Sequence, residues 1–215
     1  MATPIILVLL IAITALISFK GFKDYSFFSK YEFHIGSILK GEKYRMISSA
    51  FLHGDLMHLA FNMFTLFMFA PLVVQIFGSA YFLLLYFGSL IVGSALTLYF
   101  YKNNYNYRAI GASGAVMGIV YAAILINPEM KLFLLFIPIP IPAYIFGIGY
   151  LFYSIYGMKA NKDNIGHAAH FGGALGGLVL TLVRAPQLIE SEPMIIGLLL
   201  IPIAVLFYMV KSKKI

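Results

Sequence analysis

Long apolar runs dominate this chain and are separated by short polar segments. Each run is close to the ~20 residues that a helix needs to cross a bilayer. The runs are continuous rather than alternating, which disfavours a membrane β-barrel. The pattern therefore predicts seven helical spans, at about 4–19, 57–77, 80–101, 112–127, 132–156, 166–184 and 194–210.

Composition points to the same class of protein. Of 215 residues, 61% are hydrophobic and 11% are charged, whereas soluble domains carry about 25% charged residues. We expect an all-α polytopic membrane bundle forming one domain over 1–215, with a core over about 1–185 and an extra C-terminal helix at 194–210. The first apolar run lacks a basic start and a small-x-small cleavage site, so we expect a retained helix rather than a signal peptide.

Two counts restrict the chemistry. The chain has no cysteine, which excludes disulfides, thiolate nucleophiles and zinc bound through sulfur. Its net charge of +7 would suggest nucleic acid in a soluble protein. Here the basic residues lie in short loops between apolar spans, where they anchor and orient membrane proteins. We therefore predict the lipid bilayer, and no nucleic acid, as a partner.

The segment from Lys20 to Leu56 is the one long loop between predicted spans. It mixes charged residues with many aromatic residues. A loop of this length is usually functional or disordered. Its aromatic content favours a segment half-buried in the membrane interface, and a solvated connector is the alternative.

The fifth predicted span contains three alternating prolines, Pro138, Pro140 and Pro142. Proline lacks a backbone donor and cannot continue a regular helix. A broken segment at membrane depth must be covered by protein or water. Two interpretations remain open: a re-entrant kink or adjustable wall, or a surface loop between two shorter elements.

A serine lies between glycines at the start of the fourth span, in the run I-G-A-S-G-A-V-M-G from 110 to 118. Gly111 and Gly114 leave space on both sides of Ser113. Free N–H groups at a helix N-terminus can bind an oxygen that the serine holds. Gly114 and Gly118 form a G-x-x-x-G step, which permits close helix approach. The alternative is a serine that only bonds back to its own helix.

A matching run, A-H-F-G-G-A-L-G-G, lies in the sixth span and carries His170. Gly173 and Gly177 form a second G-x-x-x-G step. Two glycine-faced helices, one with serine and one with histidine, indicate a nucleophile and its base. No acidic residue lies deep within a span, so the sequence favours a Ser–His dyad over a triad.

The second span opens with H-G-D-L-M-H-L-A-F-N, which includes His53, His58 and Asn62. His58 and Asn62 lie one helical turn apart and share a face. Polar side chains at membrane depth are costly and usually serve function. The alternative for Asn62 is a hydrogen bond that holds two helices together.

His167 and His170 have a spacing that also occurs among metal ligands. A metal site would need a carboxylate nearby, and Asp163 is the candidate. A histidine-lined ion transporter would also need intramembrane carboxylates and is often built from internal repeats. The chain lacks both features, so we predict no metal and no cofactor.

Together, the G-A-S-G, A-H-F-G-G-A-L-G-G and H-x-x-x-x-H-x-x-x-N motifs resemble the rhomboid family of intramembrane serine proteases, over about residues 40–180. The resemblance implies a six-helix bundle around a water-filled cavity, which the C-terminal helix extends. It also implies cleavage of transmembrane protein segments near the interface, with Ser113 as nucleophile and His170 as general base.

The resemblance implies roles for further residues. Asn62, His58 and the Ser113 backbone N–H would bind the oxyanion, with His53 in support above the site. Tyr44-Arg45 resembles the family's Trp-Arg pair, so Arg45 would hold the long loop. The family often has an aromatic residue where this chain has Met117. The glycines are expected to support the site and the helix crossing: Gly111, Gly114, Gly118, Gly173 and Gly177.

The family's orientation places the N-terminus inside, and we keep that orientation and expect the cell membrane of a prokaryote. It assigns 13 of the 15 basic residues to outside loops, whereas the positive-inside rule predicts the reverse. Only Lys131 and Arg184 would lie inside. The outside residues are Lys20, Lys23, Lys30, Lys40, Lys43, Arg45, Lys102, Arg108, Lys159, Lys162, Lys211, Lys213 and Lys214.

The sequence therefore predicts an intramembrane serine endopeptidase. The alternative within the same fold is a catalytically silent protein that binds transmembrane helices. The presence of both Ser113 and His170 favours the enzyme.

Overall fold

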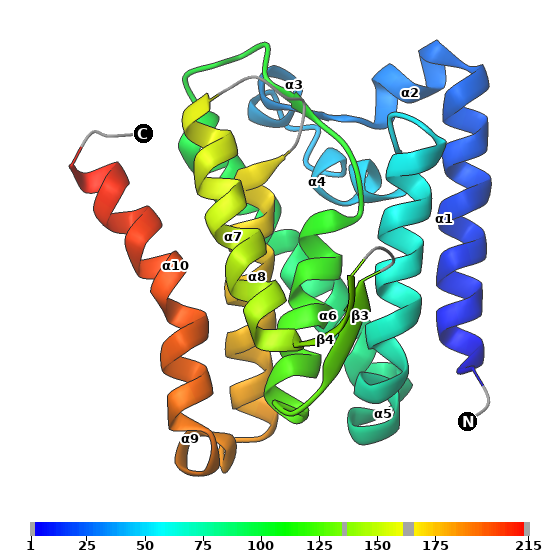
Figure 1. The fold of residues 1–215 in the computed structure, drawn as a ribbon. Coiled ribbons are helices and arrows are strands. Elements are labelled where there is room, and N and C mark those ends of the chain that lie inside the picture. Colours follow the sequence, from blue (N-terminus) through cyan, green and yellow to red (C-terminus); the bar gives the residue numbers. More distant parts are fainter. Residues whose placement is uncertain (1–2, 135–136, 161–165, 213–215) are drawn as a thin grey trace.

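The computed structural model describes residues 3–134, 137–160 and 166–212, which form a helical bundle with a small folded cap at one end (Figure 1). The helices are α1 (Ile5–Lys23), α2 (Tyr25–Tyr31), α3 (Ile35–Leu39), α4 (Arg45–Ser48), α5 (Leu56–Tyr101), α6 (Ser113–Ile126), α7 (Ala143–Ala160), α8 (His167–Arg184), α9 (Leu188–Ser191) and α10 (Pro193–Lys211), with a 3-10 turn at Ser49–Phe51. The strands are β1 (Phe33–His34), β2 (Arg108–Ala109), β3 (Lys131–Leu134) and β4 (Ile137–Pro142).

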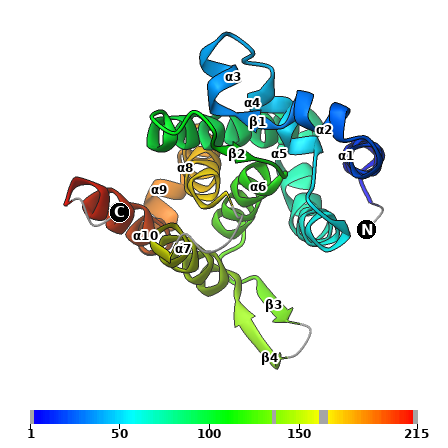
Figure 2. The same cartoon turned by 90° about the horizontal axis from the view of Figure 1, so that it is seen from above.

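Helix α6 is the centre of the bundle. Every residue from Gly114 to Leu125 is buried, and the most extensive contacts in the bundle join α5, α6 and α8 to one another. Seen from above, α1 lies to one side of this group, and α7 and α10 lie to the other (Figure 2). A helix that is apolar on all faces is buried on all faces, which explains the central position of α6.

Glycine permits the close crossing of α6 and α8. A Cβ atom added to Gly173 would collide with the carbonyl oxygen of Gly114, and one added to Gly177 would collide with that of Gly118. The two predicted G-x-x-x-G steps thus face each other, backbone against backbone. Close approach of this kind favours small residues at helix contacts in membranes.

Helix α5 contains two of the predicted spans. It begins after Asp55, whose carboxylate accepts a hydrogen bond from the His58 N–H at 2.7 Å, as an N-cap does. At Gly78 the backbone leaves helical geometry, with φ 81° and ψ 163°, a conformation that favours glycine. The break falls between the predicted spans at 57–77 and 80–101.

The prediction of one helical span over 132–156 is wrong in its first half. Strands β3 and β4 pair antiparallel there, and α7 begins only at Ala143. The hairpin projects from the side of the bundle (Figure 2). Alternating prolines explain the difference, because each removes a helical donor while a strand can place proline on its outer edge.

The long loop is folded rather than extended. It contains α2, α3, α4 and the 3-10 turn, and β1 pairs antiparallel with β2. These elements form the cap at the end of the bundle where α6 begins (Figure 1). The fold is thus mostly helical, with two short strand pairs that the all-α prediction did not include.

Three helices are long and apolar enough to cross a membrane, namely α1, α5 and α10, among the residues that the structure describes. Helix α6 is apolar but has only 14 residues. The chain is therefore a multi-pass membrane protein. The count of six core helices plus one, and the division of the domain at about 185, stay predictions.

Candidate active site

Ser113 is the first residue of α6. The turn before it depends on Gly111, which has a positive φ of 109°. A Cβ atom at Gly111 would lie 2.7 Å from two ring atoms of His58, so both backbone strain and crowding exclude a side chain there. Ser113 is half-buried, and the N–H groups of the first helical turn have no acceptor within the helix.

His170 on α8 lies beside this serine. Its Nε2 atom is 2.8 Å from the Ser113 Oγ atom, although the two residues lie 57 positions apart in the chain. The imidazole is almost completely buried. Gly114 next to the serine faces the backbone of α8, with Ala169 O 3.1 Å from an added Cβ. The glycine crossing therefore sets the approach of the two side chains.

Helix α7 supplies two neighbours of His170 that we did not predict from sequence. The Ser154 Oγ atom lies 3.2 Å from His170 Nδ1. The Tyr150 hydroxyl is 3.5 Å from His170 Nε2, and the two ring centroids are 5.1 Å apart. Their spacing of four residues places both on one helix face, which is the pattern that points to them in the sequence.

The predicted oxyanion residues lie on the first turns of α5. The Asn62 Nδ2 atom donates to the His58 carbonyl at 3.0 Å, which uses one of the two N–H donors of the amide. Asn62 is buried. The His58 ring packs against Gly111, two residues before the serine. His58 thus contacts the turn that leads into α6, and Asn62 lies one turn further along α5.

His53 connects α1 to the turn before the serine. Burial lowers the pKa of His53 to about 3, so the ring is neutral at physiological pH. Its Nε2 accepts the Ala112 N–H at 3.4 Å, and its Nδ1 lies 2.9 Å from the Ser18 Oγ atom. Ser18 donates in turn to the Phe51 carbonyl at 2.8 Å. These bonds support the backbone beside Ser113.

A sequence profile of the Rhomboid domain matches residues 40–187, more than half of the chain. The chain belongs to the rhomboid family.

Several curated proteins are similar to this rhomboid. It is 32% identical to the RHOMBOID-like protein 12, mitochondrial, of Arabidopsis thaliana over 62% of this chain and 44% of that protein. It is 29% identical to the Rhomboid protein 1, mitochondrial, of Saccharomyces cerevisiae over 64% of this chain and 40% of that protein. The Putative rhomboid protease YdcA of Bacillus subtilis is 39% identical over 38% of this chain and 40% of that protein. The matched segments thus span less than half the length of these relatives.

These relatives do not support the predicted prokaryotic cell membrane. Two of the three carry mitochondrial names, and one is bacterial. What they support is a multi-pass integral membrane protein of the rhomboid family.

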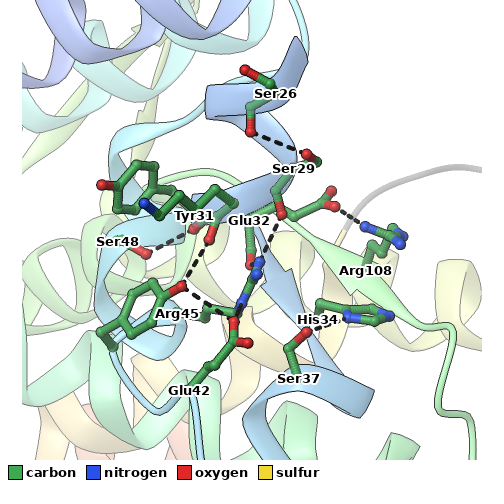
Figure 3. Close-up of polar contacts among 12 residues, drawn as sticks. Ser26, Ser29, Tyr31, Glu32, His34, Ser37, Glu42, Arg45, Ser48 and Arg108 are labelled. Atoms are coloured by element: carbon green, nitrogen blue, oxygen red, sulfur yellow. Dashed lines mark hydrogen bonds and ion pairs between the residues drawn. The ribbon is translucent and has the colours of Figure 1, made fainter. Parts of the chain in front are cut away.

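The rhomboid's cap is held together around Arg45 (Figure 3). This buried guanidinium donates to the Ser29 carbonyl at 2.7 Å, to the Glu32 carbonyl at 3.1 Å and to Glu42 Oε2 at 2.6 Å. The hydrogen bond from Arg45 lowers the pKa of the Glu42 carboxyl. Charge-assisted bonds of this kind are shorter and stronger than neutral ones, so one side chain joins three parts of the loop.

The cap is also joined to the segment that leads into Ser113. Glu32, which is buried, forms an ion pair with Arg108 (Figure 3). The backbone pairing of β1 with β2 places Phe33 opposite Ala109 and His34 opposite Arg108. Ala109 lies four positions before the serine in the chain. The long loop is therefore linked to the site through β2 and the short segment that joins β2 to Ser113.

A small cavity of about 30 Å³ lies beside the serine. Ser94 and Thr97 line it together with Leu90, Phe33 and the residues around Gly111. A cavity of this size holds one or two waters or a small side chain.

The two histidines of the metal hypothesis both lie on α8. The rings of His167 and His170 are 5.9 Å apart and nearly perpendicular. Among the described ranges, no three potential ligands from His, Asp and Glu are grouped to hold a metal ion. Asp163, the carboxylate of that hypothesis, lies outside the described residues.

Proposed function

We propose that this rhomboid is an intramembrane serine endopeptidase that cleaves transmembrane segments of other proteins with a Ser113–His170 dyad. The observation that carries the proposal is the 2.8 Å separation of Ser113 Oγ from His170 Nε2. A nucleophile and a base within hydrogen-bond reach, with the base held by a third group, are what nucleophilic catalysis requires. The family match supports the same activity.

The reaction follows from the arrangement of atoms. His170 Nε2 takes the Ser113 proton as Oγ attacks the scissile carbonyl carbon. The resulting oxyanion is bound by the Ser113 N–H and by Asn62 and His58. The same Nε2 then gives its proton to the leaving amine, which leaves an acyl-enzyme. Water, activated by His170, hydrolyses the ester and regenerates the serine hydroxyl.

Water and substrate both need access to Ser113. The serine is half-buried rather than enclosed, and Ser94 and Thr97 are among the residues that line the adjoining cavity. Its volume of about 30 Å³ suits a small substrate side chain next to the scissile bond. This supports a preference for Gly, Ala or Ser at that position.

A serine-directed phosphonate or isocoumarin probe tests the proposal. We expect covalent labelling of the detergent-solubilised protein at Ser113, located by mass spectrometry of the modified peptide. The Ser113→Ala variant is the control. A folded wild-type protein that is neither labelled nor able to cleave a transmembrane reporter would favour the alternative of a silent helix-binding protein.

Asn62→Ala is expected to lower kcat by about 10²–10³, because one of several oxyanion donors is lost. KM should change little, since the oxyanion exists only after attack. The measurement is steady-state cleavage of a transmembrane reporter in detergent. An unchanged kcat would leave Asn62 with the helix-holding role that its bond to His58 already provides.

The substrate is expected to be a transmembrane segment that unwinds near one interface. A helix keeps its carbonyls in internal hydrogen bonds, and Gly and Pro weaken it by about 1 and 3 kcal/mol per residue relative to Ala. Reporters with Gly or Pro just inside the end of the span should be cut faster than an all-Leu span that inserts equally well. Equal rates for the two reporters, measured by gel in proteoliposomes, would exclude unwinding as the selecting step.

A further inference from the structure

The face of α7 that packs against His170 carries a serine. Ser154 is completely buried, and its Oγ atom lies 3.2 Å from His170 Nδ1. The opposite ring nitrogen, Nε2, faces the nucleophile at 2.8 Å. The two nitrogens of one imidazole are thus placed between a hydroxyl on α6 and a hydroxyl on α7.

The position of the hydrogen on the His170 ring decides which group donates in the hydrogen bond between Nδ1 and Ser154 Oγ. To accept the Ser113 proton, Nε2 must be unprotonated, so the neutral imidazole carries its hydrogen on Nδ1. Ser154 Oγ is then the acceptor for that N–H. After proton transfer the ring is an imidazolium, and the Nδ1–H bond to Ser154 is unchanged. The opposite tautomer directs its hydrogen at Ser113 and cannot act as a base.

We propose that Ser154 is a positioning residue that holds His170 in the Nδ1–H tautomer and fixes the plane of its ring. The inference rests on the proposed function and deepens it. Serine proteases with a triad assign this task to a carboxylate, and no acidic residue lies on α7 or α8. A neutral hydroxyl performs the orientation without placing a second charge at membrane depth, where charge is costly.

The placement of Ser154 also makes the base depend on α7. Tyr150 lies one turn earlier on the same face, with its ring against the imidazole. The hydroxyl and the ring therefore reach His170 together, and both leave it if α7 moves away from α8. The orientation of the His170 ring by Ser154 therefore requires that these two helices stay packed.

Substitution of Ser154 tests the proposal through kcat and KM separately. Ser154→Ala is expected to lower kcat by about 10–10²-fold, less than the ~10⁴ that follows loss of the orienting carboxylate in a triad, with KM within about twofold. Ser154→Thr keeps the hydroxyl and should recover most of kcat. Thr181→Val is the matched control, because it removes a buried hydroxyl of α8 that lies 11 positions beyond His170 in the chain; its kcat should match the wild type.

The tautomer itself can be read by nitrogen NMR of ¹⁵N-histidine protein in detergent, with the His170 signals identified from a His170→Gln sample. Wild type should show hydrogen on Nδ1, and Ser154→Ala should show a mixture. Hydrogen on Nε2 in the wild type, or an unchanged kcat in Ser154→Ala, would overturn the proposal. If Ser154→Ala does not fold, the wild-type spectrum and Ser154→Thr decide it.

If the proposed function itself is wrong, the experiments give a different result. In that case the wild type neither cleaves the reporter nor reacts with the serine-directed probe, whatever the tautomer of His170. If the wild type cleaves the reporter and the Ser154→Ala variant has the same kcat, only the positioning role of Ser154 is contradicted.

Discussion

Ser113→Ala and His170→Ala are each expected to abolish cleavage of a transmembrane reporter, with a loss of at least about 10⁴ in kcat. In the proposed mechanism, the first removes the oxygen that attacks the carbonyl, and the second removes the base that lies 2.8 Å from it. Because the two act as one unit, the double variant should be no worse than either single variant. Both proteins should elute from gel filtration in detergent as the wild type does.

Thr14→Ala serves as the control for these variants. Thr14 is a buried hydroxyl on α1 that bonds to the Leu10 carbonyl at 2.8 Å, and α1 lies across the bundle from α8 (Figure 2). The Thr14→Ala variant should cleave the reporter at nearly the wild-type rate. Normal cleavage by either Ser113→Ala or His170→Ala would exclude the dyad and, with it, the proposed mechanism.

Gly177→Val and Gly173→Val are expected to be the most damaging changes to the fold. An added side chain at either position meets a backbone carbonyl of α6, which cannot rotate away as a side chain can. Overpacking costs about 1–3 kcal/mol even where the neighbours can shift. We therefore expect a clear drop in the thermal unfolding temperature in detergent, together with loss of activity as His170 moves away from Ser113.

Gly197→Val is the matched control for this crossing. It makes the same substitution in α10, where no atom lies within 4 Å of an added Cβ. Its unfolding temperature should be close to that of the wild type. If Gly177→Val and Gly197→Val unfold at the same temperature, the α6–α8 crossing does not depend on glycine.

The hydrophobic pattern predicts helices well here because each span must satisfy its own backbone. Helix α6 was predicted at about 112–127 and runs from Ser113 to Ile126. The G-x-x-x-G steps were informative for a related reason: paired glycines on two helices leave few alternatives to close contact. The approach of Ser113 to His170 follows from that contact.

The hydrophobic pattern did not predict the contacts that depend on how separate elements pack against one another. The cap is held by bonds from Arg45 to backbone carbonyls, which spacing alone does not specify. Aromatic residues occur on every face of α7, so periodicity could not tell which face meets His170. Tyr150 and Ser154 were therefore missed, although their spacing of four was visible.

The shortness of α6 has a consequence for where the chemistry takes place relative to lipid. Its 14 residues span about 21 Å, whereas the hydrocarbon layer is about 30 Å thick. A lipid-exposed helix answers such a mismatch by thinning the bilayer around it. Helix α6 is instead buried by the rest of the protein from Gly114 to Leu125, and it begins below the cap in Figure 1. The surrounding helices thus cover the difference in length. Under the proposed function, a substrate would have to bring its scissile bond below the headgroup level to reach the serine.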